Sequence, residues 1–403
     1  MKTLLVKQGD IAEAAQVIKS GGLVAVPTET VYGLAGNGLD AAAVARIYEV
    51  KGRPGQKPLS LMVSGAADMK KYWTDVPWGA RVLAEKYWPG PLTLVMTSAS
   101  GIPEIVTAGG PTVGLRCPDH PLTLELLEQT GLPLAAPSAN PSGEESPKTA
   151  EKVMEYFDGR IDAVIDGGEC VLGVESTIID FSTSPCTLIR KGAIPMDEIE
   201  RALVDGLVII GVTGGTGCGK TTALNVLEGL GALVIDCDAV YHELTRSSRE
   251  MKEELTARFG PVYNGDELDR KALGNVVFSD GTALSDLNRI THKYVNNEVE
   301  RRLLDWAKRG GKYAAIDAIE LLESGIAPRC RTTVGIIAPT EDRVKRLMLR
   351  EGITGEYARM RIEVQKSNEY FEENCGHVIN NDGTYEQFQD KCEKLFGKLL
   401  KEE

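Results

Sequence analysis

A glycine-rich stretch, GVTGGTGCGKTT at residues 211–222, contains the residue types that bind phosphate groups. Within it, residues 214–221 follow the pattern GxxxxGK[ST] at every position. Glycines let successive backbone N–H groups face one phosphate chain, Lys220 adds a positive charge at its β and γ oxygens, and the Thr221 hydroxyl suits Mg²⁺. An apolar run before the stretch and a helical pattern after it disfavour a plain glycine-rich turn. The residues expected to contact a nucleoside triphosphate are Gly215, Thr216, Gly217, Cys218, Gly219, Lys220, Thr221 and Thr222.

Two carboxylates follow the next apolar run, in the segment VIDCDAV. Asp236 and Asp238 would stand at the carboxyl end of a strand, where open α/β sheets bind their ligands. A carboxylate there can accept a proton from an attacking hydroxyl group or hold Mg²⁺ through water. The alternative role is to cap the following helix. We favour the chemical role for Asp236 and leave both roles open for Asp238.

An arginine-rich segment lies further along the chain, at residues 343–361. A Gly-Ile-Thr-Gly break at 352–355 divides it into two helices joined by a turn. We expect a lid that closes arginines over transferring phosphates and excludes water, with a solvent-exposed charged face as the alternative. The arginines are Arg343, Arg346, Arg350, Arg359 and Arg361.

The front half of the chain concentrates polar residues in four short stretches: PTETVYGL (27–34), KGRPGQKPL (51–59), APSANPSG (136–143) and GVESTIID (173–180). Each stretch alone has an ordinary explanation as a turn, a charged loop or a cap. Together they place positive groups beside compact hydrogen-bonding side chains at strand ends. This combination predicts a pocket for a phosphorylated ligand that carries hydroxyl groups.

The elements that must position these residues differ between the two halves. Behind residue 206, apolar runs alternate with helical patterns, which predicts a parallel sheet covered on both faces. The front half mixes strands and helices and favours a twisted mixed sheet with helices around it. In the back half, the expected strands are 207–212, 232–236, 313–317, 333–338 and 377–380. In the front half, they are 22–27, 59–63, 92–96, 112–116, 163–166, 176–180 and 186–190. The expected helices include 41–50, 78–87, 122–129, 150–157, 286–308 and 385–401. We place the domain boundary near residues 203–206, which gives domains 1–203 and 207–403.

Composition excludes several classes of protein. The net charge of −13 is spread over both halves, with 18 Lys and Arg against 25 Asp and Glu up to residue 203, and 27 against 33 after it. Stable binding to nucleic acid is therefore not expected. The eight cysteines form no CxxC pair, and with four histidines they favour reduced thiols over a zinc site or disulfides. No long apolar run or signal peptide is evident, so we expect a cytoplasmic protein without a membrane partner.

The half from Leu207 onward resembles the dephospho-CoA kinase family over nearly its whole length. The motifs that carry the resemblance are the glycine-rich loop, VIDCDAV, LDRKAL, THKYV, ESG, REGIT and RIEVQ. The resemblance implies a five-stranded P-loop kinase with a helical lid that uses ATP and Mg²⁺ to phosphorylate the ribose 3′-hydroxyl of dephospho-CoA. The implied roles are Asp236 as general base, Lys220 and Thr221 at the phosphates and Mg²⁺, Arg350 and Arg361 in the lid, Arg270 and His292 near the acceptor, and Gln365 near the acceptor or lid.

This half departs from the family pattern on the acceptor side. It reads DAIELLE at 317–323, with Ile319 and Glu320 where the family has Pro and Leu, and Lys293 where a Pro follows the His. Another nucleoside or small metabolite therefore stays open as the acceptor.

The front half, from Lys2 to Leu203, resembles the YrdC-type threonylcarbamoyl-AMP synthase family. A KxR and SxN signature carries the resemblance, together with PTET and GLRCPDHP. It implies that L-threonine, bicarbonate and ATP form threonylcarbamoyl-adenylate, the donor for N6-threonylcarbamoylation of adenosine 37 in tRNA, so the machinery that transfers this group to tRNA is an implied partner. The implied roles are Lys51 and Arg53 at the ATP phosphates, Ser138 and Asn140 at the nucleotide, and Thr28, Arg116 and Ser176 at threonine. Longer family members append another small domain where this chain has its kinase-like half. A non-catalytic RNA-binding module is the alternative.

Overall fold

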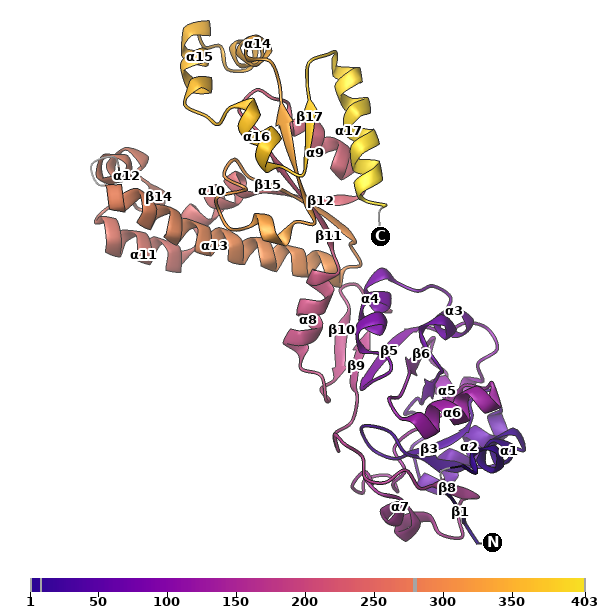
Figure 1. The fold of residues 1–403 in the computed structure, drawn as a ribbon. Helices are drawn as coiled ribbons and strands as arrows, with labels where there is room; N and C mark the ends of the chain where they lie inside the picture. Colours follow the sequence, from indigo (N-terminus) through magenta and orange to yellow (C-terminus); the bar gives the residue numbers. More distant parts are fainter. Residues whose placement is uncertain (1, 8, 278–280, 402–403) are drawn as a thin grey trace. The chain divides into compact units, whose positions relative to one another are not determined.

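A computed structural model describes residues 2–7, 9–277 and 281–401 of the chain. The chain divides into two compact units (Figure 1). The first comprises Met1–Gly206 with Lys308–Gly310, and the second comprises Leu207–Ala307 with Gly311–Glu403. We call them the front unit and the back unit.

The front unit is built on one sheet of ten strands, in the order β1-β8-β2-β3-β7-β4-β6-β5-β9-β10. The pairing is mixed, because β2 runs parallel to β8 and antiparallel to β3. This confirms the expected mixed sheet. The strands are β1 (Leu4–Val6), β2 (Val24–Val26), β3 (Gly33–Asn37), β4 (Ser60–Met62), β5 (Leu92–Thr97), β6 (Thr112–Arg116), β7 (Leu134–Ala135), β8 (Ala163–Ile165), β9 (Thr177–Asp180) and β10 (Thr187–Arg190).

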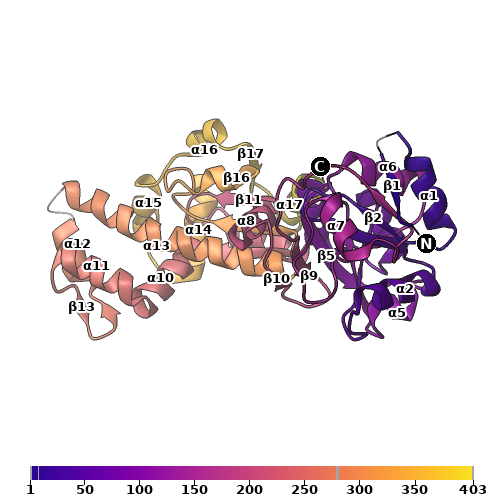
Figure 2. The same ribbon diagram turned by 90° about the horizontal axis from the view of Figure 1, so that it is seen from below.

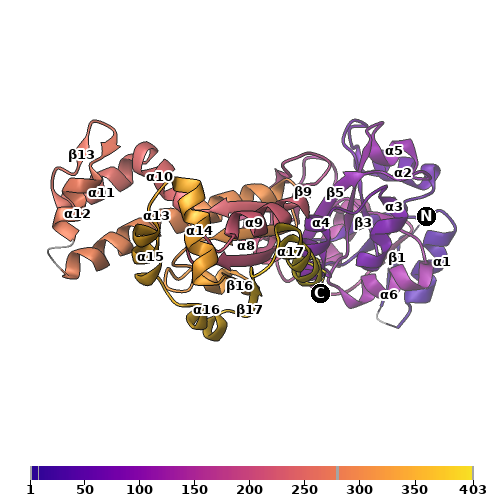
Figure 3. The same ribbon diagram turned by 90° about the horizontal axis from the view of Figure 1, so that it is seen from above.

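Helices cover both faces of the front sheet. Figures 2 and 3 show α1 and α6 on one side of the strands and α2 and α5 on the other. Ile11, Ile18, Leu122 and Leu126 bury the α1 and α6 side against β2 and β8 residues such as Val24. The helices are α1 (Ile11–Lys19), α2 (Ala41–Lys51), α3 (Met69–Tyr72), α4 (Trp78–Tyr87), α5 (Glu104–Thr107), α6 (Pro121–Thr130), α7 (Ala150–Phe157) and α8 (Met196–Asp205).

Three strands of this sheet, β1, β3 and β7, are not among the strands expected from the sequence. β3 has the sequence GLAGN, which lacks the β-branched and aromatic residues that mark strands. Its glycine content has a packing reason, because a Cβ at Gly36 would lie 2.9 Å from Leu23 Cδ2. Close approach of the core to the backbone therefore selects glycine inside this strand.

The back unit contains five parallel strands in the order β12-β15-β11-β16-β17, as expected. They are β11 (Val208–Thr213), β12 (Ala232–Asp236), β15 (Tyr313–Asp317), β16 (Thr332–Ile337) and β17 (His377–Asn380). Helices α9 (Lys220–Gly229) and α17 (Tyr385–Leu399) lie side by side next to these strands (Figure 1). Phe388 and Phe396 of α17 are buried in one hydrophobic core with Ala223 and Leu227 of α9 and with residues of the strands.

Two helical assemblies extend from the back sheet. The first has its own core around Met251, Leu255 and Phe259, and the second has a smaller core around Leu347 and Ala358. The first is formed by α10 (Cys237–Ser247), α11 (Arg249–Phe259), the hairpin β13 (Tyr263–Asn264) and β14 (Glu267–Leu268), α12 (Arg270–Val277) and α13 (Gly281–Lys308). The second is the helix pair α14 (Thr340–Glu351) and α15 (Gly355–Glu363), which confirms the two expected helices and the break between them, and α16 (Asn368–Asn374) follows this pair.

Within the ranges that the structure describes, no helix is long and apolar enough to cross a membrane.

Candidate active sites

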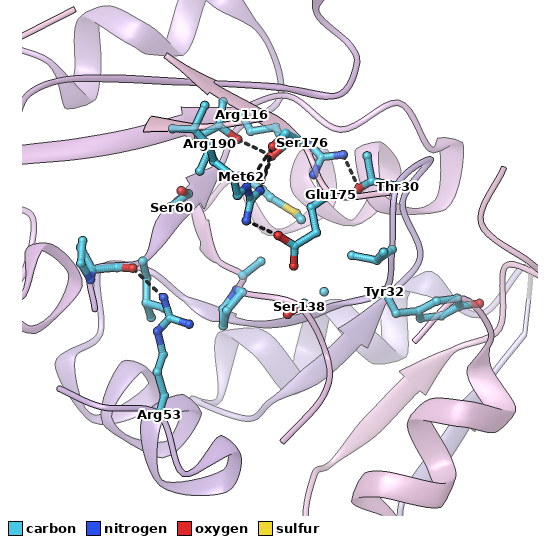
Figure 4. Close-up of a pocket in the computed structure, with 18 residues that line it drawn as sticks. Thr30, Tyr32, Arg53, Ser60, Met62, Arg116, Ser138, Glu175, Ser176 and Arg190 are labelled. Atoms are coloured by element: carbon cyan, nitrogen blue, oxygen red, sulfur yellow. Dashed lines mark hydrogen bonds and ion pairs between the residues drawn. The ribbon is translucent and has the colours of Figure 1, made fainter. Parts of the chain in front are cut away.

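A pocket of about 190 Å³ opens on the sheet of the front unit (Figure 4). All four polar stretches identified in the sequence contribute to its wall. Arg53 lies at one side of the opening, and Arg116, Ser176 and Arg190 lie at the other (Figure 4). The lining residues are Thr30, Val31, Tyr32, Gly33, Arg53, Pro58, Leu59, Ser60, Met62, Thr93, Arg116, Ala136, Pro137, Ser138, Glu175, Ser176, Ile178 and Arg190.

Lys51 joins two of these stretches from behind the pocket wall. It is the last residue of α2, which ends there because Gly52 adopts a left-handed conformation with φ of 61°. The Lys51 ammonium is buried and donates to the backbone carbonyls of Ser138 and Asn140. Burial and, to a smaller extent, the Arg53 guanidinium lower the pKa of Lys51 to about 8, against the opposing effect of the Glu175 carboxylate. Lys51 therefore holds the loop that presents Ser138 to the pocket.

Arg53 and Asn140 retain polar groups for a ligand. Arg53 donates to the carbonyls of Lys57 (3.1 Å) and Pro58 (3.0 Å), which fixes its guanidinium at the pocket wall. Asn140 is buried and donates from Nδ2 to the carbonyls of Pro141 (3.0 Å) and Glu144 (2.7 Å). Its Oδ1 atom is buried and accepts no hydrogen bond from the residues that the structure describes. That oxygen can accept a hydrogen bond from a bound molecule.

Arg116 lies in a buried ion pair that the sequence pattern did not reveal. Its Nη2 atom lies 2.7 Å from Glu29 Oε1 and 2.8 Å from Thr30 Oγ1. Glu29 also accepts from the backbone N–H of Asp119 at 3.0 Å. Thr28 is buried, and its hydroxyl is engaged within the turn, where it donates to the Val31 carbonyl at 2.7 Å. Thr30, two residues on, lines the pocket instead of Thr28.

Ser176 is held by Arg190, a residue without a predicted role. Arg190 donates from Nη2 to the Ser176 carbonyl (2.9 Å) and hydroxyl (3.0 Å), and its Nη1 lies 2.5 Å from Glu175 Oε2. Burial lowers the pKa of Arg190, and Glu175 opposes this effect. Arg190 ends the apolar strand β10, and a charge at a strand end was the only sequence signal for it. Together with Arg53 and Arg116 it makes the pocket suitable for an anion.

In the back unit, the glycine-rich loop joins β11 to α9. Gly217 and Gly219 adopt φ of 82° and 105°, in the left-handed region that favours glycine. The loop delivers the chain to the N-terminus of α9, which begins at Lys220. Among the predicted phosphate contacts, Gly215 and Cys218 are buried, Thr216, Gly217, Gly219, Lys220 and Thr222 are half-buried, and Thr221 is exposed. The conformation fits the expected phosphate-binding role.

Two carboxylates from neighbouring strands meet beside this loop. Asp236 and Asp317 are register partners at the ends of β12 and β15. Asp236 Oδ1 accepts from the Ala239 N–H at 3.0 Å, so it caps α10 as the alternative interpretation proposed, while its side chain is exposed. Asp317, to which the sequence assigned no role, has its Oδ1 3.4 Å from Lys220 Nζ without a hydrogen bond. Burial raises the Asp317 pKa; Lys220 lowers it and Asp236 raises it.

These groups fit a magnesium ion that arrives with a nucleotide. Mg²⁺ prefers oxygen ligands and is commonly held by one or two protein groups together with substrate phosphates. The Thr221 hydroxyl at the start of α9 and the buried Asp317 Oδ1, which accepts no hydrogen bond from the described residues, are such groups. Among the described residues, no cluster of three or more His, Cys, Asp or Glu could hold a metal without the nucleotide.

A second pocket, of about 310 Å³, lies between α10, α13 and the segment after β15. Asp238 and His292 line it, and so do Ile319 and Glu320 of the DAIELLE segment, which differs from the family pattern. His292 Nε2 lies 3.7 Å from Glu320 Oε2. Arg270 is outside this lining and contacts His242 Nδ1 at 3.2 Å. The full lining is Cys237, Asp238, Tyr241, Leu287, Asn288, Thr291, His292, Val295, Asn296, Ala318, Ile319, Glu320, Ser324 and Ile326.

The arginine-rich segment separates into groups with different contacts. Arg350 and Arg361 both pair with the Glu351 carboxylate, and neither of them lines the two pockets described above. Arg359 pairs with Glu341 at the surface of the helix pair. The remaining two, Arg343 and Arg346, point to the glycine-rich loop and contact its backbone carbonyls. The expected roles of Arg350 and Arg361 at the phosphates stay predictions.

Comparisons with known proteins divide the chain in the same way. Residues 16–192 match the Sua5, YciO and YrdC family model, described as telomere recombination, and residues 208–387 match the dephospho-CoA kinase model. The threonylcarbamoyl-AMP synthase of Pyrococcus abyssi is 46% identical over 198 residues, which are 49% of this chain and 58% of that protein. A putative threonylcarbamoyl-AMP synthase of Methanocaldococcus jannaschii is 37% identical over 184 residues, 46% of this chain and 86% of that protein.

The back half has its own relatives. The dephospho-CoA kinase of Geobacter sulfurreducens is 33% identical over 192 residues, which are 47% of this chain and 98% of that protein. The chain spans little more than half the length of the Pyrococcus abyssi synthase. With its front half matched to one family and its back half to another, the chain belongs to both the Sua5, YciO and YrdC family and the dephospho-CoA kinase family.

Proposed function

We propose that the chain is a bifunctional enzyme with two catalytic domains, at 1–203 and 207–403. Its front domain forms threonylcarbamoyl-adenylate from L-threonine, bicarbonate and ATP. The observation that supports this most directly is the contact of Lys51 with Ser138 and Asn140, beside a pocket that carries three arginines. The product would supply the machinery that threonylcarbamoylates tRNA.

The front reaction requires positioning more than a protein nucleophile. The threonine amine and bicarbonate first form threonine carbamate with release of water. An oxygen of this carbamate attacks the α-phosphorus of ATP, the bond from that phosphorus to the bridging oxygen of the β-phosphate breaks, and pyrophosphate leaves. Arg53 faces the phosphates, and Ser138 and Asn140 hold the nucleotide. Arg116, Ser176 and Thr30 form the threonine side, and Thr28 supports Thr30 through the contact of their hydroxyls at 2.8 Å. Fixed positive groups around developing charge and a held carbamate together account for the acceleration.

Raising the pH should inhibit this front reaction through Lys51. The folded-state pKa of about 8 lies below the ordinary lysine value, so the ammonium is lost as the pH rises through about 8. We expect kcat/KM for pyrophosphate release to fall about tenfold per pH unit above that point. The free energy of unfolding should rise over the same range, because the unfolded chain then binds more protons at this site.

Initial rates from about pH 6.5 to about pH 9.5 measure this dependence. Lys51→Arg should move the fall to higher pH, because a guanidinium stays charged there. A rate that stays level up to about pH 9.5 in the parent protein contradicts the role of the Lys51 charge.

We further propose that the back domain phosphorylates the 3′-hydroxyl of dephospho-CoA with ATP. Asp236 accepts the proton of the 3′-hydroxyl as the hydroxyl oxygen attacks the γ-phosphorus, the bond from that phosphorus to the β–γ bridging oxygen breaks, and ADP leaves. Lys220 neutralises the β and γ oxygens. Thr221 and Asp317 would hold Mg²⁺, which would offset the negative charge of the phosphates when bound. Arg350 and Arg361 close over the phosphates, and His292 and Arg270 face the acceptor.

Glu320 supports a second candidate for the acceptor substrate. It places a carboxylate in the pocket of about 310 Å³ where the acceptor would bind. A carboxylate there repels an anionic acceptor and suits a neutral nucleoside better. Another nucleoside or small metabolite is therefore the alternative substrate.

One incubation tests both activities. The protein is given ATP, Mg²⁺, L-threonine, bicarbonate and dephospho-CoA, and the products are identified by mass spectrometry. We expect threonylcarbamoyl-adenylate, which disappears when threonine or bicarbonate is omitted, and coenzyme A, which does not. Adenosine and nucleoside monophosphates in separate reactions test the alternative acceptors. Absence of the adenylate product would refute the front assignment, and phosphorylation of adenosine alone would refute dephospho-CoA as the acceptor.

A further inference from the structure

Arg343 and Gln365 clamp one residue of the glycine-rich loop. Arg343, in the first turn of α14, donates from Nε to the Thr216 carbonyl at 2.9 Å and from Nη2 to Gln365 Oε1 at 2.7 Å. Gln365 contacts Thr216 twice: its Oε1 accepts from the backbone N–H at 2.9 Å, and its Nε2 donates to the hydroxyl at 2.8 Å. Gln365 follows α15, so the loop is tied to both helices of the pair.

The next two carbonyls of the loop are held in the same way. Arg346, one turn after Arg343, donates to the Gly217 carbonyl at 3.2 Å and to Asn381 Oδ1 at 3.1 Å. Asn381 is buried and donates to the Cys218 carbonyl at 2.8 Å. In a trans peptide the N–H of the next residue points away from the carbonyl. Holding these oxygens on the outside therefore turns the following N–H groups to the inner side of the loop.

The loop also packs directly on these side chains. A Cβ at Gly215 would collide with the Arg343 guanidinium, and a Cβ at Gly219 would collide with the Asn381 amide. The glycines thus serve contact with the supporting groups as well as backbone conformation. The clamp and the loop form one packed unit.

Arg343 carries a buried charge that its own partners do not neutralise. The residue is only 3% exposed, yet its hydrogen-bond partners are a carbonyl and an amide. Within the described part of the chain, no ion pair with a carboxylate is formed by Arg343 or Arg346. A buried cation is stable only when an opposite charge or several dipoles compensate it. A bound triphosphate beside the loop supplies such a charge.

We propose that Arg343 and Gln365 are positioning residues for phosphoryl transfer: they keep the glycine-rich loop in its phosphate-binding shape, and Arg343 adds a fixed positive charge behind it. This inference rests on the proposed kinase function. It gives Arg343 a different role from a lid arginine, since its side chain is committed to the loop before a nucleotide binds. Gln365 then links the end of the helix pair to the loop.

Two replacements of Gln365 test the clamp, one by placing an opposite charge on Arg343 and one by removing the side-chain contacts. Gln365→Glu keeps the shape and the oxygen that accepts from Thr216, but it places a carboxylate on Arg343 and cancels its charge. Gln365→Ala removes the clamp and leaves the charge. We expect both variants to weaken the Kd for ATP about tenfold, and the KM for dephospho-CoA to stay within about twofold of the parent value. Calorimetric titration with ATP and steady-state rates at saturating ATP measure these quantities.

Matched controls identify a general loss of structure. Gln389→Glu makes the same charge change on α17, where Gln389 contacts Glu393, and should leave the Kd for ATP within about twofold. Threonine-dependent pyrophosphate release by the front domain, measured in the same samples, should be unchanged. If a Gln365 variant unfolds, Thr216→Val removes only the hydroxyl contact and should weaken ATP binding about threefold.

The outcomes distinguish this inference from the proposed function. If both Gln365 variants bind ATP as tightly as the parent, the positioning role is wrong. A purely structural role would instead raise both KM values and lower the melting temperature in parallel. If the parent protein binds ATP but does not phosphorylate dephospho-CoA, the proposed kinase function fails, while the ATP titrations still test the clamp.

Discussion

Lys220→Ala should reduce phosphorylation of dephospho-CoA about a thousandfold while threonine-dependent pyrophosphate release continues at the parent rate. Lys220 begins α9 and is the cation placed next to Asp317, at 3.4 Å. Without it, the developing charge on the β and γ oxygens loses its nearest protein counter-charge. Coenzyme A formation in a coupled assay, with pyrophosphate release in a parallel sample, measures both rates.

The matched control for this variant is Lys394→Ala. Lys394 pairs with Asp390 on the exposed face of α17 and should tolerate replacement with less than about a twofold change. A Lys220→Ala protein that retains more than about a tenth of the kinase rate would show that the loop is not the phosphate site. Loss of both activities would indicate misfolding and would be resolved by Lys220→Arg, which keeps the charge.

The reciprocal experiment is Lys51→Met, which should lower threonylcarbamoyl-adenylate formation at least about a hundredfold and leave the kinase rate unchanged. Methionine fills a similar volume but donates no hydrogen bond. The buried carbonyls of Ser138 and Asn140 then lose their donor, and the pocket loses a nearby positive charge. Pyrophosphate release that depends on threonine and bicarbonate provides the measurement.

Lys19→Met is the control for the front domain. Lys19 also donates from its ammonium to a backbone carbonyl, that of Gln129 at 2.8 Å, but it does so at the surface. We expect no change in either activity. Retention of full synthase activity by Lys51→Met would remove Lys51 from the mechanism and weaken the assignment of the front domain. The two lysine variants together establish whether the activities are independent.

The features read correctly from the sequence have local causes. A GxxxxGK[ST] loop between an apolar run and a helical pattern is specified within about a dozen residues, since glycine torsions and strand burial are short-range properties. The five strands of the back sheet followed in the same way from apolar runs of the right length. The break between α14 and α15 was predictable because Gly352 and the Thr354 cap lie only two positions apart in the chain.

Contacts between residues that are distant in the sequence could be identified only from the folded structure. Asp317 faces Asp236 only because β12 and β15 pair in that register. Likewise, Arg190 reaches Ser176 because β9 and β10 form adjacent antiparallel strands, and Glu29 meets Arg116 from different elements. A single sequence does not specify such registers, because strand pairing depends on the packing of the whole sheet.

The sequence by itself determined the two patterns that are expected to bind phosphate, the fold classes and most elements of both halves, because these depend on short-range torsions and hydrophobic periodicity. The tertiary structure alone decided which side chains serve each pattern. In the folded chain, Arg343 and Arg346 contact the glycine-rich loop. Arg359 forms an ion pair with Glu341, and Arg350 and Arg361 form ion pairs with Glu351. The physical reason is that a helix offers its charged residues to several faces, and only packing selects the face that each one meets.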